Sequence, residues 1–233
     1  MPAAGYAGPL GTGWSIGGTP SLFQGSPLTL TASLDPSKAC QGQPGWVFGQ
    51  PARELAPLPY SGNSDAWALA NGGVPASGSY LAVDVQSSPG QAVIVDGVGV
   101  TVVHRSTPTG RVWAQLGGGC GGLVPSFFSA DLDAGGDVRA VAGQDANGRT
   151  VVPVPFPHTL DDTDRSEQWR IELVTKGCDC SVVPYLDYTA DGRTGRIEIT
   201  NRGGPWRVTP TKGTTPVARD AQDGVWTAYG KAP

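Results

Sequence analysis

The chain has 233 residues, with 16 Lys and Arg against 20 Asp and Glu, and a formal net charge of −4. No basic cluster exceeds two or three residues, so the concentrated basic face with which proteins bind nucleic acid or an anionic membrane surface is missing. The chain contains 35 Gly and 21 Pro, about twice their usual combined share, and few of the strong helix formers Glu and Lys. This composition favours strands joined by turns.

The first 26 residues show no hydrophobic period and indicate a flexible arm. One short helix is expected at 64–73, with Ser64 as its N-cap, Asp65 in its first turn and a glycine at its C-terminus. Short segments that alternate, or that are rich in β-branched residues, predict strands. These segments are 28–34, 45–49, 80–86, 92–106, 111–116, 126–133, 137–143, 150–156, 167–175, 182–189 and 195–200.

About ten to twelve short strands with turn signals between them are typical of an all-β fold. We expect an antiparallel β-sandwich, immunoglobulin-like or jelly-roll-like, with at most one short helix. It should span 27–210, either as one unit or as two sub-domains that divide near 105–125. The Thr/Pro-rich segment 211–233 is expected to be a flexible tail, with a docked strand around Trp226 as the alternative. The longest apolar run, 91–103, is too short to cross a bilayer, so no membrane span is expected in this chain.

The four cysteines, Cys40, Cys120, Cys178 and Cys180, form an even set that allows three pairings. On a strand, Cys178 and Cys180 would face the same side with Cα atoms roughly 6.5 Å apart, near the upper limit for a disulfide. We therefore expect each of them to pair with Cys40 or Cys120, in either arrangement. Such long-range bridges would each stabilise the fold by about 2–5 kcal/mol. Two disulfides would indicate an oxidising compartment.

Three other uses of the cysteines are less well supported by the sequence than disulfides. A four-cysteine zinc site usually presents two knuckles of closely spaced cysteines, and here two of the four are isolated. A redox-active Cys-x-Cys pair would lack a thioredoxin-like pattern around it, and Lys176 is the one flanking cation. A soft-metal site would find little support from one Met and two His.

The segment DYTADGRTGRIE, residues 187–198, comes close to a calcium-binding loop. Asp187, Thr189 and Asp191 stand at ligand spacing, and Glu198 stands at the twelfth position. The third position is Thr rather than Asp or Asn, however, and the flanking segments favour strands rather than helices. A β-hairpin with Asp-Gly at its turn explains the pattern without a metal. We expect the hairpin, with no metal and no cofactor, and keep calcium as the alternative.

The segment GWSIG, residues 13–17, matches the nucleophile-elbow pattern of serine hydrolases. No strand is predicted before it, and the two candidate bases are His104, inside a predicted strand, and His158, in the segment PFPHTL. Since no nucleophile, base and orienting group fall on neighbouring elements, an enzyme is not expected. The tryptophans could include a stacking platform for sugar rings, although most should pack in the core. They are Trp14, Trp46, Trp67, Trp113, Trp169, Trp206 and Trp226.

Seven short segments occur in a fixed order between residues 72 and 209: GGVPASG, AVIVDGVGVTVVHR, CGG, FFSADLD, CDC, GRTGRI and GGPWRV. Together they resemble an uncharacterised family of actinobacterial extracytoplasmic domains. The resemblance implies the C-terminal part of membrane-anchored proteins, some of which carry an N-terminal helix-turn-helix region and a single membrane span. It implies no catalytic residues.

These observations predict a non-enzymatic module outside the cytoplasm that is cross-linked by two disulfides. Its loops would bind or sense a ligand, which could be a protein, a small molecule or a carbohydrate. A structural component of the cell envelope or of an assembly is the alternative, and a hydrolase is the third hypothesis.

Overall fold

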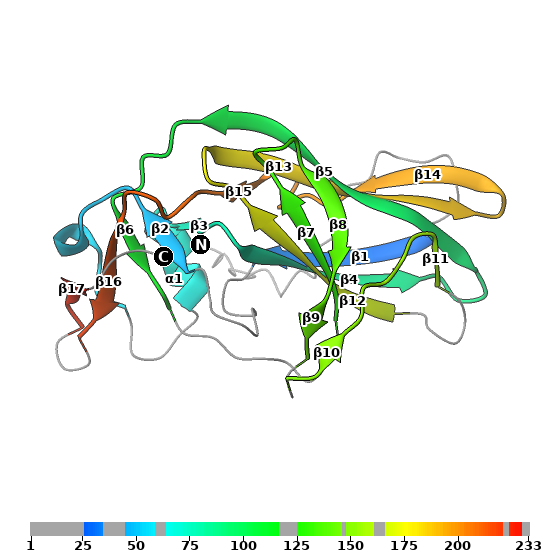
Figure 1. Ribbon diagram of the computed structural model, residues 1–233, viewed down its shortest axis with the longest axis horizontal. Helices are drawn as coiled ribbons and strands as arrows, with labels where there is room; N and C mark the ends of the chain where they lie inside the picture. Colours follow the sequence, from blue (N-terminus) through cyan, green and yellow to red (C-terminus); the bar gives the residue numbers. More distant parts are fainter. Residues whose placement is uncertain are drawn as a thin grey trace, which may run out of the picture.

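Two five-stranded sheets face each other in the computed structural model (Figure 1), which describes residues 26–34, 45–58, 64–116, 125–145, 148–160, 166–220 and 224–229. The first sheet contains, in spatial order, β1 (Leu28–Leu34), β4 (Ser79–Ser87), β12 (Ser166–Val174), β7 (Ser126–Asp131) and β8 (Asp137–Val141). The second contains β11 (His158–Leu160), β5 (Val93–Ser106), β13 (Asp179–Ala190) and β14 (Arg193–Glu198), with β15 (Trp206–Val208) also paired to β13. The expected all-β sandwich is confirmed.

Buried and exposed side chains alternate along the strands, and the buried ones form a core between the two sheets. In β4, Leu81, Val83 and Val85 are buried while Asp84 and Gln86 are exposed, as expected for a strand with one face toward the interior. β12 contributes Trp169, Ile171 and Leu173, and β5 and β13 supply the opposite side of the same cluster. The sandwich is therefore held by apolar burial between its sheets.

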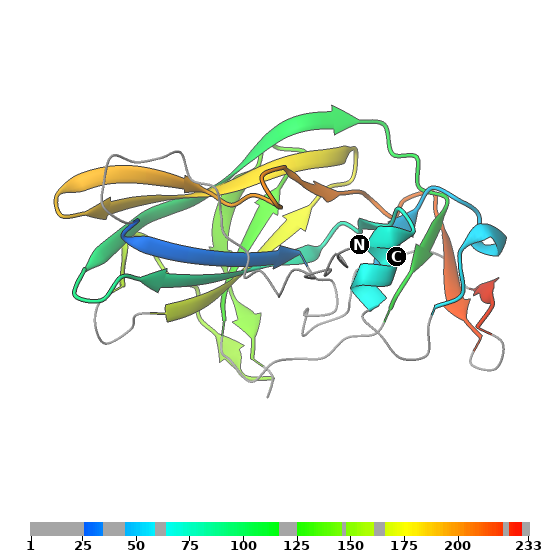
Figure 2. The ribbon, with the colours of Figure 1, turned by 180° about the vertical axis from the view of Figure 1, so that it is seen from behind.

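A third, smaller sheet lies at one end of the sandwich (Figure 1). Its strands, in spatial order, are β17 (Trp226–Ala228), β16 (Thr215–Arg219), β6 (Val112–Ala114), β2 (Trp46–Phe48) and β3 (Val74–Pro75). Helix α1 (Ser64–Ala70) lies at the junction of this sheet and the sandwich (Figure 2). The remaining elements are the short helix η2 (Ala52–Glu54) and a two-stranded ladder of β9 (Gly143–Gln144) and β10 (Thr150–Val151).

The small sheet corrects the expectation of a flexible tail at 211–233. Residues 215–219 and 226–228 are strands, and Val217 and Trp226 are buried in a second core. β16 pairs in parallel with β6, whose residues precede it by about a hundred positions. The alternative, a docked strand around Trp226, is what the structure contains.

Two features refine the predicted organisation. The small sheet combines segments from three separate parts of the chain, so the division into two units does not fall at one point near 105–125. The sheets are also not wholly antiparallel, because β12 pairs in parallel with β7, and β16 with β6. Of the expected N-terminal arm, residues 1–25 lie outside the described residues.

Candidate functional site

A groove of about 600 Å³ lies where the sandwich, helix α1 and the small sheet meet, and we call it the α1 groove. This volume is within the range of roughly 300–1,000 Å³ that is typical of small-molecule sites. Its apolar lining includes Leu34, Leu69, Val74, Pro75, Pro205 and Trp206. These residues come from β1, α1, β3 and the segment leading into β15, so the groove exists only in the folded chain.

Helix α1 forms one wall of the groove because a buried side chain and a hydrogen bond attach it to the small sheet. Its buried residue, Ala68, belongs to the small-sheet core, which leaves the neighbouring Leu69 59% exposed. The indole Nε1 of Trp46 donates to Asp65 Oδ1 over 3.1 Å and ties the start of the helix to β2. The helix is therefore held in a position that leaves Leu69 at the surface.

The end of α1 confirms the predicted glycine cap. Gly72 has φ = +73°, a conformation that glycine adopts without a side-chain penalty. The Gly73 N–H donates to the Ala68 carbonyl (2.8 Å) and the Gly72 N–H to the Leu69 carbonyl (3.1 Å). This Schellman-type ending turns the chain directly into β3 at the groove.

Two arginines and one carboxylate add charge to the lining: Arg202, Arg207 and Asp65. Arg207 donates from Nε to Asp179 Oδ1 (3.1 Å) and from Nη2 to Asp179 Oδ2 (2.6 Å). Its side chain is nevertheless 54% exposed. Those two bonds use two of the five guanidinium N–H donors and fix the orientation of the rest.

The described tryptophans mostly pack in the interior, as expected. Trp169 lies in the main core, and the rings of Trp67 and Trp226 stack at 5.4 Å in the small-sheet core. Trp46 and Trp206 line the α1 groove but are almost fully buried, so neither presents the open face that a sugar platform requires. Trp113 is also buried, and Trp14 lies outside the described residues.

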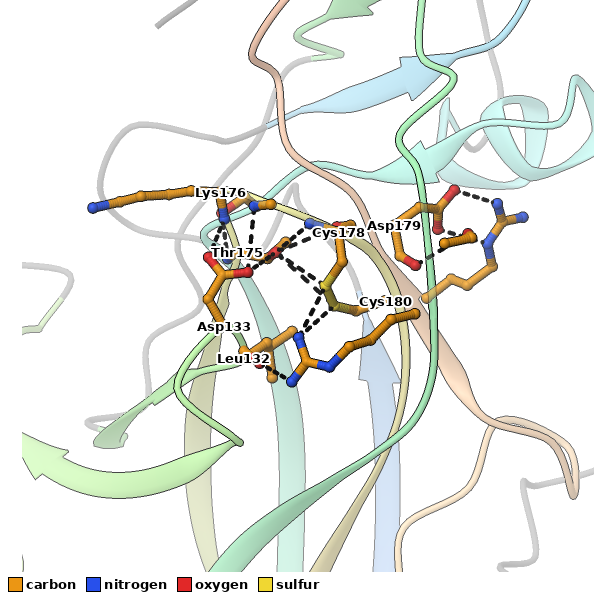
Figure 3. The surroundings of a disulfide bond; sticks show 12 residues. Leu132, Asp133, Thr175, Lys176, Cys178, Asp179 and Cys180 are labelled. Carbon is orange, nitrogen blue, oxygen red and sulfur yellow. Dashed lines mark hydrogen bonds and ion pairs between the residues drawn. A yellow bond between two sulfur atoms is a disulfide. The ribbon is translucent and has the colours of Figure 1, made fainter.

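A second cluster surrounds Cys178 and Cys180, whose sulfur atoms are in contact and are drawn as a disulfide in Figure 3. This corrects the expectation that each would reach Cys40 or Cys120, both of which lie outside the described residues. β13 begins at Asp179, so Cys178 lies between a bend at 176–177 and the strand, and not in the strand itself. The two Cα atoms are consequently 5.2 Å apart, well within the range for a disulfide.

The local pairing changes the energetic role expected of these cysteines. A disulfide between them would close a loop of three residues. By the dependence of unfolded-chain entropy on loop length, it would stabilise the folded state by about 1.6 kcal/mol. That is less than the contribution expected of a long-range bridge. The presence of two disulfides in this chain stays a prediction.

Arg105 is a cation that lies beside the sulfur atoms. Its Nη1 lies 3.5 Å from Cys178 Sγ and 4.0 Å from Cys180 Sγ. Its Nη2 donates to the Leu132 carbonyl over 2.5 Å. The strand register explains its position, because Arg105 on β5 is the direct partner of Cys180 on β13. Lys176, the flanking cation in the sequence, extends away from the sulfurs (Figure 3).

The carboxylate of Asp133 organises the turn that carries Cys178. It accepts hydrogen bonds from the Lys176 N–H (2.6 Å), the Gly177 N–H (3.3 Å) and the Thr175 hydroxyl (3.0 Å). Burial acts to raise the pKa of Asp133, but these three hydrogen bonds and the charge of Arg105 outweigh it and hold the pKa below its ordinary value of 3.8. The ionised carboxylate is therefore favoured in the folded state.

Replacing Asp133 by Asn is expected to lower the free energy of unfolding at pH 7 by about 1 kcal/mol, a value reduced for the exposure of this residue. Because the pKa of Asp133 is lower in the folded state than in the unfolded state, its ionised carboxylate stabilises the fold fully at pH values above the unfolded-state pKa. This stabilisation is lost as the pH falls through the folded-state pKa. Urea unfolding should thus show a smaller difference between variant and wild type at pH 3 than at pH 7. Asp137→Asn, which removes an exposed carboxylate in β8, is the control. A pH-independent difference would contradict this role.

The acidic segment at 187–198 forms the predicted hairpin. β13 and β14 are antiparallel, and Asp191 (φ = 50°) and Gly192 (φ = 71°) make the turn. The calcium candidates are not brought together. Asp187 binds Arg196 through two hydrogen bonds of 2.6 and 2.8 Å, Thr189 donates to Asp96 over 2.7 Å, and Glu198 pairs with Tyr185 far from the turn. Within the described ranges, no group of three or more His, Cys, Asp or Glu side chains could hold a metal.

The hydrolase hypothesis depended on Ser15, which lies outside the described residues, and on two histidines. His104 is exposed on β5. The Nε2 atom of His158 lies 2.5 Å from Glu167 Oε1, and the other oxygen of Glu167 accepts a bond of 2.8 Å from the Trp169 indole. This arrangement ties β11 to β12 across the edge of the sandwich.

Comparisons with known proteins add no assignment to this geometry: no protein-family model, curated protein or solved structure matches the chain. In the part of the chain that the structure describes, no helix has the length and apolar character needed to cross a membrane.

Proposed function

We propose that this chain is a non-catalytic binding or sensing module that works outside the cytoplasm. We further propose that its α1 groove takes a small amphipathic molecule with an apolar body and an anionic group. The observation that carries this proposal is the groove itself, where the exposed Leu69 lies among further apolar lining residues, with two arginines and Asp65 also in the lining. The extracytoplasmic location is supported by the family resemblance of the sequence and by the two disulfides that its four cysteines predict.

The chemistry of the lining favours this kind of ligand. Apolar side chains from four elements would remove an apolar body from water, which is the main source of affinity in small-molecule sites. Arg207 is already oriented by Asp179. Its remaining N–H donors could therefore bind a carboxylate, sulfonate or phosphate with little further loss of side-chain freedom.

The test is a fluorescence titration with 8-anilinonaphthalene-1-sulfonate, which combines an aromatic body with a sulfonate. Wild-type protein should bind it saturably, and Leu69→Asp should weaken binding about tenfold or more, because it removes an apolar contact and adds a like charge for the probe. Ala70→Asp is the matched control. It places the same charge in the same last turn of α1, on an exposed residue outside the groove lining.

The Ala70→Asp variant should bind the probe within about twofold of wild type. Near-UV circular dichroism of all three proteins shows whether each keeps its tertiary structure, so that weaker binding by a folded variant can be assigned to the groove. Equal weakening in both variants, or no saturable binding by folded wild type, would contradict the proposal. The second result would favour the alternative of a structural envelope component.

A further inference from the structure

We infer that Cys178 and Cys180 form a reversible dithiol–disulfide site that exchanges with low-molecular-weight thiols, with Cys178 as the sulfur that is attacked and Cys180 as the leaving sulfur. This site is separate from the α1 groove and does not depend on the function proposed for it. Three observations carry the inference: the access to each sulfur, the position of Arg105, and the small loop that the pair closes.

The two sulfurs differ in access. Cys178 lines a shallow, open groove of about 500 Å³ together with Arg105, Ser106, Thr107, Asp133 and Gly177. Both cysteines belong to the main core, but Cys178 keeps 5% of its surface exposed whereas Cys180 has none. Among the described residues, Cys178 is therefore the sulfur of the pair that faces a groove from which an external thiol could approach.

Arg105 provides the electrostatic condition for exchange. A guanidinium keeps its charge at every physiological pH, and a nearby positive charge stabilises a thiolate. In thiol–disulfide exchange, the rate rises as the leaving thiolate becomes more stable. Arg105 is held between the carbonyl of Leu132 and the sulfurs, so it would face a thiolate on either cysteine without moving.

Reduction of the pair takes two exchange steps. An external thiolate attacks Cys178 Sγ, a new disulfide forms between them, the Cys178–Cys180 bond breaks, and the electron pair leaves on Cys180 as a thiolate beside Arg105. A second external thiolate then attacks the external sulfur of this mixed disulfide and releases Cys178 as a thiolate. Overall, two thiols lose two protons and two electrons to become one disulfide, and the cysteine pair takes up two electrons and two protons.

A purely structural role explains the pair less well. A bridge across three residues restricts the unfolded chain much less than one across a long loop. The bend from Thr175 to Cys178 is already held by the hydrogen bonds of Asp133. The turn therefore does not depend on the sulfur–sulfur bond for its shape.

The experiment uses the full chain, purified without reductant, and reduced glutathione as the probe. Samples are acid-quenched over time, alkylated after denaturation, and digested so that the peptide containing residues 178–180 is measured alone by mass spectrometry. We expect no alkylation of this peptide at the start. Glutathione should then produce a mixed disulfide on Cys178, followed by two alkylated thiols, under conditions where the protein stays folded.

Two matched variants test the assignment of Arg105. Arg105→Gln should slow the reduction by about fivefold, because it removes the charge beside the leaving sulfur. Lys176→Gln removes one positive charge from the same turn, but from a side chain that extends away from the sulfurs, and should leave the rate unchanged. Equal slowing in both variants would overturn the role of Arg105.

Single cysteine variants remain informative if Arg105→Gln fails to fold. With oxidised glutathione, folded Cys180→Ser should become modified on Cys178, whereas folded Cys178→Ser should react at least about tenfold more slowly, because Cys180 has no exposed surface and does not line the groove. The inference would be overturned by alkylation of both cysteines in untreated protein, by reduction that occurs only after unfolding, or by equal reactivity of the two single cysteines.

Discussion

Replacing Trp169 by alanine is expected to lower the free energy of unfolding by about 3–5 kcal/mol. Trp169 lies at the centre of β12 and is fully buried between the two sheets. Its ring packs on Phe128 with centroids 5.4 Å apart and on Phe156 with centroids 6.0 Å apart. Its Nε1 donates to Glu167 over 2.8 Å. The truncation would thus remove a large apolar volume and a hydrogen bond, and urea unfolding measures the loss.

The Trp169→Phe variant separates packing from hydrogen bonding at this position. It keeps an aromatic ring in the core but cannot donate to Glu167, so it should cost about 1–2 kcal/mol. If phenylalanine proved as destabilising as alanine, the hydrogen bond and not the aromatic packing would be the main contribution of this residue.

Gly136→Ala should be the most damaging glycine substitution near the cysteine cluster, at about 3 kcal/mol or more. Gly136 has φ = +92°, and an added Cβ would lie 2.3 Å from the carbonyl oxygen of Val100 on β5. Because this oxygen belongs to the backbone of β5, it cannot relieve the clash by a change of side-chain rotamer. The turn also carries Leu132 and Asp133, which hold Arg105 and the bend before Cys178, so the variant should alter the thiol site as well.

Gly135→Ala is the matched control for that prediction. Gly135 also has a positive φ, +110°, but an added Cβ would meet nothing within 4 Å. Its cost should be limited to backbone strain, about 1–2 kcal/mol. Thermal and urea unfolding of both variants provide the comparison, and equal destabilisation would show that the contact with Val100 is unimportant.

Features set by local sequence were predicted well. The alternation in β4 and β12 follows from burial on one face, and the turn at Asp191–Gly192 follows from the backbone that Asp-Gly favours. Helix α1 was predicted from Ser64 and Asp65 at its start and from the glycines that end it. In each of these cases the residues that determine the structure lie within a few positions of one another.

Features that depend on distant partners were missed. β16 has its partner β6 about a hundred residues earlier in the chain, and no local pattern marks a strand of five residues within a Thr/Pro-rich segment. The parallel pairing of β12 with β7 has the same origin. The second core around Trp226 exists only after these pairings form.

The candidate sites show the same division between local and distant information. The motif Cys-x-Cys was visible, but its geometry depended on β13 beginning at Asp179, one residue after Cys178. Arg105 could not be connected with the cysteines until the register of β5 and β13 was known. The α1 groove combines several segments that are far apart in the sequence, and its one visible signal was the apolar Leu69 next to the glycines that end the helix.

The most direct test of the proposed binding site is fluorine NMR of protein labelled with 5-fluorotryptophan, with each signal assigned by a Trp→Phe variant. Trp46 and Trp206 line the α1 groove, whereas Trp169 and Trp226, which belong to the same two cores, are not part of its lining. Adding saturating 8-anilinonaphthalene-1-sulfonate should shift the signals of Trp46 and Trp206 and leave those of Trp169 and Trp226 in place. Shifts confined to Trp226 or Trp169, or no shift in any signal, would contradict a ligand site in the α1 groove.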